Sequence, residues 1–120
     1  MLRLSYIFIE VALTKEQAKN YLKTLNSENE KHEFVMHLYC HNGQMFQCLG
    51  ISRFTNHSSN PSIEPGEICN GHYNLYASRD ILPGDEITED YSDYESLDFY
   101  EDLCKEYNVE SASVCAKKYK

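Results

Sequence analysis

The chain has 120 residues, of which 42% are hydrophobic, so it supports one compact domain with a modest core and excludes a second domain. The apolar run at residues 4–9 is too short for a membrane span or a signal peptide. Five cysteines without a Cys-x-x-Cys pair argue against a disulfide framework. We therefore expect an intracellular protein, cytoplasmic or nuclear. The net charge of -8 is concentrated in residues 80–106, where eleven acids accompany one base, which disfavours direct nucleic-acid binding and favours a basic protein or peptide partner.

The first elements in chain order are a strand and a helix. Residues 3–13 are rich in β-branched and aromatic side chains, as in a largely buried strand. Thr14 and Gln17 form a capping-box pattern that predicts a helix beginning there. The polar residues 26–31 are expected to form a loop. The apolar face of the helix comprises Ala18, Tyr21, Leu22 and Leu25.

Strands are predicted through the middle of the chain. Residues 34–39 and 45–49 are short apolar runs separated by Asn42-Gly43, a strong hairpin signal. Residues 50–67 are dense in Ser, Asn, Pro and Gly, and are expected to be mostly irregular, as a binding loop would be. Residues 72–78 and 86–91 are predicted strands joined by a type II turn at residues 82–85.

The acidic C-terminal region predicts one further helix. It is expected from about residue 95 to residue 107, with Ser92 and Glu95 capping its start and residues 111–120 fraying. The alternative that the acidic side chains merely form a solvated, solubilising face stays open. The apolar face of this helix comprises Leu97, Tyr100, Leu103, Cys104 and Tyr107.

A metal site is not predicted. The side chains that could contribute ligands are His37, Cys40, His41 and Cys48. Zinc needs four tetrahedral nitrogen or sulfur ligands, and this spacing fits no common zinc pattern. Packing and surface roles are therefore expected for these residues.

Two segments carry the most informative pattern. Residues 53–61 read Arg-Phe-Thr-Asn-His-Ser-Ser-Asn-Pro, and residues 80–91 read Asp-Ile-Leu-Pro-Gly-Asp-Glu-Ile-Thr-Glu-Asp-Tyr. Together, and in this order, they resemble the two signatures of the SET-domain protein lysine methyltransferases. The resemblance is specific over residues 53–61 and 77–91 and loose over residues 4–49.

The resemblance implies a fold that is mainly β with α, an α+β arrangement. We expect a SET-like β-clip of several short sheets, with a knot-like C-terminal segment and two short helices. Residues 1–95 would form the SET-like domain, N-terminally minimal, and residues 96–120 an acidic helix and tail packed on it. Whether a second copy of the chain completes the site in a homodimer stays open.

The resemblance also implies methyl transfer from S-adenosylmethionine to a lysine side chain of a basic protein segment. Tyr91 would be the catalytic residue, orienting the amine, because a phenol with a pKa near ~10 is a poor base at neutral pH. Independently of the resemblance, Arg53 and Asp90 flank the two segments, and an ion pair that holds the segments together and simple surface solvation of both side chains stay open as alternatives. The cofactor-binding candidates are Arg53, Phe54, Asn56 and His57, and the candidates for an aromatic substrate channel are Tyr39, Tyr73, Tyr76 and Tyr94.

The sequence also departs from the family pattern. Relatives usually open with a Gly-x-Gly hairpin at the methionine end of the cofactor, whereas the first glycine here is Gly43. Ser59 replaces a cysteine that in many relatives joins a zinc cluster after the domain, so no zinc is expected. The missing hairpin keeps open a degenerate SET-like acidic protein-binding module without catalysis. The acidic charge of residues 80–106 keeps open an unrelated acidic inhibitor or mimic of nucleic acid.

Overall fold

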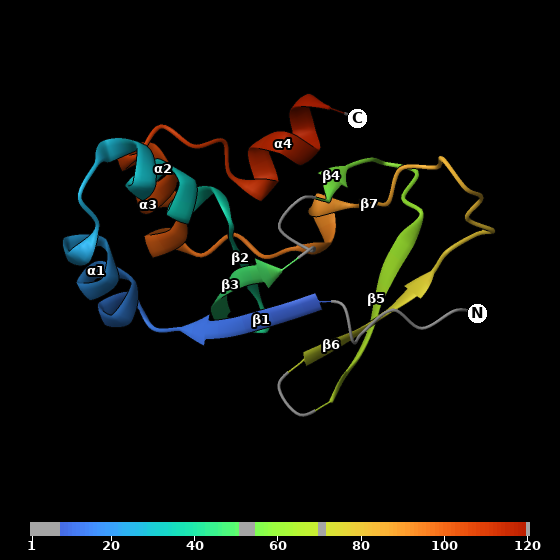
Figure 1. Ribbon diagram of the computed structural model, residues 1–120, viewed down its shortest axis with the longest axis horizontal. Helices are drawn as coiled ribbons and strands as arrows, with labels where there is room; N and C mark the ends of the chain where they lie inside the picture. The colour runs from blue at the N-terminus through green and yellow to red at the C-terminus, as the bar shows by residue number, and fades with distance from the viewer. Residues whose placement is uncertain (1–7, 51–54, 70–71, 120) are drawn as a thin grey trace.

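The computed structural model describes residues 8–50, 55–69 and 72–119 (Figure 1). Three small sheets and four α-helices make up these residues, so the fold is mixed α and β, without a closed barrel in the described part. The described residues therefore contain more helices than the two short ones that we expected. In Figure 1 the helices α1 (Lys15–Thr24), α2 (Glu28–Met36) and α3 (Asp98–Glu106) gather at one end of the molecule. The hairpin of β5 (Ile63–Cys69) and β6 (His72–Ala77) lies at the other end.

The largest sheet has the order β1-β3-β2, with both pairs antiparallel. Its strands are β1 (Phe8–Leu13), β2 (Leu38–His41) and β3 (Gln44–Gly50). Asn42 and Gly43 both have positive φ angles, 52° and 73°, as a two-residue type I′ turn requires, so the predicted hairpin is confirmed. The Gly43 N–H donates to the Glu95 carboxylate at 2.7 Å, which ties this turn to the chain before the third helix.

Helix α1 (Lys15–Thr24) begins where the sequence predicted. The hydroxyl of Thr14 accepts the Gln17 N–H at 3.1 Å, and the Gln17 side chain accepts the Thr14 N–H at 2.8 Å, which completes the capping box. Ala18 and Leu22 are buried, but Tyr21 is 44% exposed and lies at the edge of the core. The Tyr21 ring nevertheless contacts Phe34, with ring centroids 4.8 Å apart.

The second helix, α2 (Glu28–Met36), was not predicted. The expected loop at residues 26–31 is wrong, as is the expected strand start at residue 34. Ser27 caps the helix by accepting the Glu30 N–H at 3.1 Å, and acidic residues in the first turn favour its N-terminus. Phe34 and Val35 are buried in the core from this helix. A short apolar run cannot by itself distinguish a buried helix from a strand.

The middle of the chain forms two further sheets. β5 pairs antiparallel with β6, so the expected irregular segment is wrong from Ile63 onward. β4 (Asn56–His57) pairs in parallel with β7 (Thr88–Glu89), which is much shorter than the strand predicted at residues 86–91. The turn before it is confirmed, because Gly84 has a φ of 92° and the Asp85 N–H donates to the Leu82 carbonyl at 3.0 Å.

The C-terminal region contains a 3₁₀ turn, η3 (Tyr91–Asp93), and the helices α3 (Asp98–Glu106) and α4 (Ala112–Lys118). The predicted Ser92 and Glu95 cap is wrong. Asp90 accepts the Ser92 N–H at 3.0 Å, and Glu95 is held by the hairpin turn. The expected fraying of the tail is also wrong, because Ser111 caps α4 and the Tyr100 hydroxyl accepts the Ala112 N–H at 3.0 Å.

The main hydrophobic core lies between the helices and the β1-β3-β2 sheet. The five apolar residues predicted for the C-terminal helix all pack into it, as do buried residues of α1 and α2. Its fully buried side chains include Val35, Cys40 and Met45. α3 is thus part of the same core as the N-terminal helices, while α4 contacts η3 beside the β4–β7 pair (Figure 1).

Candidate functional site

The parallel pairing of β4 with β7 brings the two signature segments into contact. Asn56 pairs with Thr88, and His57 pairs with Glu89. The Ser58 N–H donates to the Glu89 carbonyl at 2.9 Å and continues the ladder. Segments far apart in the sequence therefore present His57 beside Tyr91, the second residue after β7.

The imidazole of His57 is fixed on one side only. Its side chain is 5% exposed, and its Nδ1 accepts the Tyr91 N–H at 3.0 Å. Because Nδ1 is an acceptor, the ring is neutral with its proton on Nε2, and the Asp90 carboxylate at 3.9 Å from Nδ1 does not form a true ion pair. Nε2 is buried and has no hydrogen-bond partner among the described residues. A buried donor without a partner is costly, so Nε2 marks a position where a ligand acceptor fits.

The carboxylate of Asp90 is held mainly by Ser92. Its carboxylate accepts hydrogen bonds from the Ser92 N–H at 3.0 Å and the Ser92 hydroxyl at 2.6 Å. These bonds, more than the nearby His57, keep the pKa of Asp90 below its usual range. The ion pair considered between Asp90 and Arg53 involves a residue, Arg53, that lies outside the described residues.

Tyr91 has a directed hydroxyl. It donates to the Thr55 carbonyl at 2.5 Å, and its ring lies 5.3 Å from that of His57 and 6.1 Å from that of Tyr94, centroid to centroid. Burial, followed by the charge of Glu89, raises the pKa of the Tyr91 phenol above its ordinary value. Tyr91 is therefore a neutral phenol at physiological pH and not a base.

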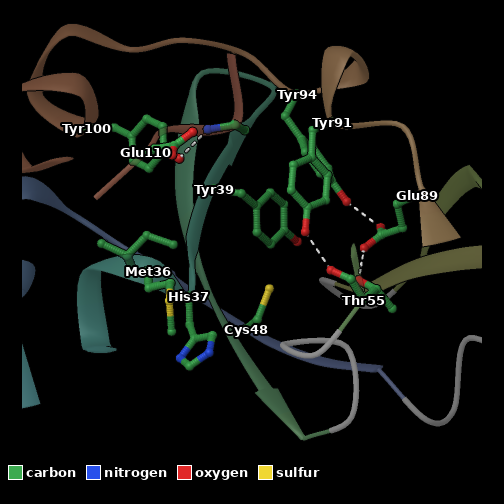
Figure 2. Close-up of a pocket in the computed structure, with 12 residues that line it drawn as sticks. Met36, His37, Tyr39, Cys48, Thr55, Glu89, Tyr91, Tyr94, Tyr100 and Glu110 are labelled. Atoms are coloured by element: carbon green, nitrogen blue, oxygen red, sulfur yellow. Dashed lines mark hydrogen bonds between the residues drawn. The ribbon is translucent and has the colours of Figure 1, made fainter. Parts of the chain in front are cut away.

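Glu89 lies beside these tyrosines, and sequence reasoning missed it. Its carboxylate accepts hydrogen bonds from the hydroxyls of Thr55 and Tyr94 (Figure 2). Burial raises the pKa of Glu89, although both hydrogen bonds oppose that shift. Its position two residues before Tyr91 indicated that it lies near the site, but its hydrogen-bond partners depend on the pairing of β4 with β7.

Two hollows meet at Tyr91. An inner cavity of about 80 Å³ contains the rings of Tyr39, Tyr91 and Tyr94 and the carboxylate of Glu89 (Figure 2). An outer cleft of about 460 Å³ is lined by Asn56, His57 and residues of the α4 region. The residues that line both hollows are Met36, His37, Thr55, Tyr91 and Glu110.

The predicted channel tyrosines are distributed unequally. Tyr39 and Tyr94 line the inner cavity with ring centroids 4.7 Å apart, and burial raises the pKa of both phenols. Tyr76 is partly buried in β6 and lines neither hollow. The side chain of Tyr73 lies outside what the structure describes.

The predicted cofactor residues are described only in part. Asn56 lines the outer cleft, is exposed, and donates from its side-chain amide to the Glu86 carboxylate at 2.7 Å. His57 lies next to it in β4, on the same cleft. Arg53 and Phe54 fall in residues 51–54, outside the described residues.

Neither a metal centre nor a membrane span is found in the described residues. No three His, Cys, Asp or Glu side chains within the described ranges are grouped so that they could hold a metal ion. Within the same ranges, no helix has both the length and the apolar character needed to cross a bilayer. The two hollows are lined by tyrosines, two histidines, carboxylates and smaller polar and apolar side chains.

Comparison with known proteins gives a family. No curated protein and no solved structure matches the chain. The family model described as SET domain matches residues 4–92, which is most of the chain. The matched range includes both signature segments, the residues of β4 and β7 that line the two hollows, and Tyr91. The chain therefore belongs to the SET-domain family.

Proposed function

We propose that this chain transfers a methyl group from S-adenosylmethionine to a lysine side chain of a basic protein segment. The observation that carries the proposal is the position of Tyr91. Its ring forms a wall of both the outer cleft and the inner cavity, and its N–H holds the imidazole of His57. A methyl donor in the cleft and an amine in the cavity would meet there.

The residues of the cleft fit such a cofactor. The buried Nε2–H of His57 has no partner among the described residues, and it suits an acceptor nitrogen of a purine ring. Asn56 would provide an amide beside it, and its present bond to Glu86 lies at the exposed edge of the cleft. When bound, S-adenosylmethionine supplies a methyl group on a positively charged sulfur. The transfer forms a nitrogen–carbon bond, breaks the carbon–sulfur bond and releases a thioether, with the amine proton passing to water.

The chain's contribution to this reaction is alignment and electrostatics. Tyr91 donates its hydroxyl hydrogen to Thr55, so its oxygen lone pairs remain available to an incoming amine. Tyr39 and Tyr94 supply ring faces that suit an aliphatic stem and a cationic head. Holding the reacting atoms in line, in a site that excludes most water, lowers the barrier without any group acting as a strong base.

A basic partner is supported by the charge of the C-terminal region. Helix α3 exposes acidic side chains beside the core, and the chain as a whole has a formal net charge of -8. Such a field accelerates encounter with a positively charged segment and weakens with rising salt. We propose that this surface attracts the segment that carries the lysine. The exposed acids of α3 are Asp98, Asp102 and Glu106.

Calorimetric titration with S-adenosylmethionine tests the proposal. The wild-type chain should bind the cofactor saturably, and Asn56→Ala should lose most of that affinity. Asn60→Ala is the matched control, because Asn60 is an exposed asparagine four residues after Asn56 in the same signature segment and lines neither hollow. An absence of binding at millimolar cofactor, or equal loss in both variants, would contradict the proposal.

A second candidate is a SET-fold acidic module that binds basic proteins without catalysis. It is favoured by the first glycine, Gly43, whose N–H is held by Glu95 in a hairpin and which lines neither hollow. The methionine end of a cofactor would then lack the close glycine backbone expected for it. Binding of a basic peptide by a chain that shows no cofactor binding would select this candidate.

A further inference from the structure

The inner cavity contains a carboxylate whose hydrogen bonds define how the tyrosines are oriented. Glu89 accepts from the Tyr94 hydroxyl through one oxygen and from the Thr55 hydroxyl through the other. Tyr91 in turn donates its hydroxyl to the Thr55 carbonyl. Both tyrosine hydrogens are therefore committed to acceptors in the protein. Their oxygens can only accept a hydrogen bond from a group that enters the cavity.

No counter-charge is placed beside this carboxylate in the part of the chain that the structure describes. Among the described residues Glu89 forms no ion pair, whereas the exposed Glu110 at the rim of the cavity is paired with Lys118 at 3.0 Å. Burial and the charge of Asp93 both raise the pKa of Glu89. A buried carboxylate in this state gains stability from any cation that comes close to it.

We propose that Glu89 is the counter-charge for the substrate nitrogen, and that the inner cavity selects an alkylammonium group. The identification of that group as lysine rests on the proposed function. The bound ammonium first releases one proton to water, and the neutral amine then attacks the methyl group, so positive charge moves from the sulfur of the donor to the nitrogen. A fixed carboxylate on the cavity side stabilises this nitrogen charge, and the acceptor oxygens of Tyr91 and Tyr94 receive its hydrogens.

n-Butylammonium provides a direct probe, because it reproduces the end of a lysine side chain without requiring a known protein substrate. Its binding is measured by NMR from the ring resonances of Tyr39 and Tyr94, with 1-butanol as the neutral probe of similar shape. Glu89→Gln should weaken n-butylammonium binding about tenfold and change 1-butanol binding by less than about twofold. Glu16→Gln is the matched control, since it removes the same charge from an exposed position on α1 that lines neither hollow.

Equal affinity of wild-type protein and Glu89→Gln for n-butylammonium would overturn the proposal, as would an absence of saturable binding in the wild type. A second measurement needs no variant. Carbon NMR of the Glu89 carboxyl should show that n-butylammonium lowers its pKa, because a cation nearby favours the ionised form. An unchanged pKa at saturating probe would also overturn it.

The outcome is separable from that of the proposed function. If n-butylammonium binds through Glu89 and S-adenosylmethionine does not bind, the counter-charge role stands and methyl transfer falls. If the cofactor binds and Glu89→Gln has no effect on n-butylammonium, only the role of Glu89 is lost.

Discussion

Ser62 connects the two signature segments, and its removal gives a testable cost. It is completely buried, directly after Pro61 at the end of the first segment. Its hydroxyl accepts the Thr88 N–H at 2.9 Å and donates to the Glu86 carbonyl at 3.2 Å. Ser62→Ala removes both bonds while keeping the Cβ, so the change is confined to the hydroxyl.

The size of the destabilisation follows from the two backbone groups that lose their hydrogen-bond partner in Ser62→Ala. The Thr88 N–H stays buried and loses its acceptor, which costs about 1–3 kcal/mol. The Glu86 residue is exposed, so its carbonyl can bind water and adds little. We expect Ser62→Ala to lower the free energy of unfolding by about 2 kcal/mol, a large share of the total for a domain of this size.

Urea unfolding followed by circular dichroism measures this difference. At a slope typical of small domains, the midpoint should fall by about 1 M. Ser59→Ala is the matched control, because Ser59 is exposed in the same loop, and its effect should stay within about 0.5 kcal/mol. A Ser62→Ala midpoint equal to that of the control would refute the reasoning that this hydroxyl holds β7 in place.

Three further outcomes follow from the structure. Tyr91→Phe should keep the affinity for S-adenosylmethionine within about twofold, because only a hydroxyl on the cavity side is lost. The variant should alter turnover or the number of methyl groups added, which mass spectrometry of a methylated substrate would show. Unaltered turnover and product would contradict the role of the hydroxyl. Tyr100→Phe should cost about 1–2 kcal/mol and speed hydrogen exchange at the first amide of α4, and unaltered exchange there would show that another contact anchors the helix. Burial raises the pKa of Cys40 to about 12 and that of Cys104 to about 11. In the native protein at pH 8, iodoacetamide should therefore label Cys115 well before Cys40 or Cys104. Early labelling of Cys40 would contradict the described core.

Local signals in the sequence predicted the elements that have strong local determinants. The Thr14 capping box, the Asn42-Gly43 turn and the Gly84 turn each depend on side-chain bonds or φ angles that neighbouring residues define. Helix α2 was missed because its apolar residues Phe34 and Val35 lie close to the strand residues that begin at Leu38 and were interpreted as one run with them. Its local signal was the Ser27 cap, and the packing of Phe34 and Val35 with residues of α1 and α3 adds long-range support for the helix.

The site shows the same division between local and long-range information. The motifs indicated Asn56, His57 and Tyr91 as candidates, and the structure places all three around the outer cleft. The roles of Thr55 and Glu89 could not be predicted, because their contact requires the parallel pairing of two strands far apart in the chain. A residue's burial and its hydrogen-bond partners across such a pair are properties of the fold and not of the local sequence.

The central claim is that the cleft beside Tyr91 binds the methyl donor through His57. It is tested most directly by nitrogen NMR of the imidazole side chains during titration with S-adenosylmethionine. The account predicts a neutral His57 ring protonated at Nε2, with a saturable shift of that nitrogen as the cofactor binds. His32, whose Nδ1 lies 2.8 Å from the Tyr107 carbonyl, is the internal reference and should not shift. An unchanged His57 signal at millimolar cofactor would contradict the account.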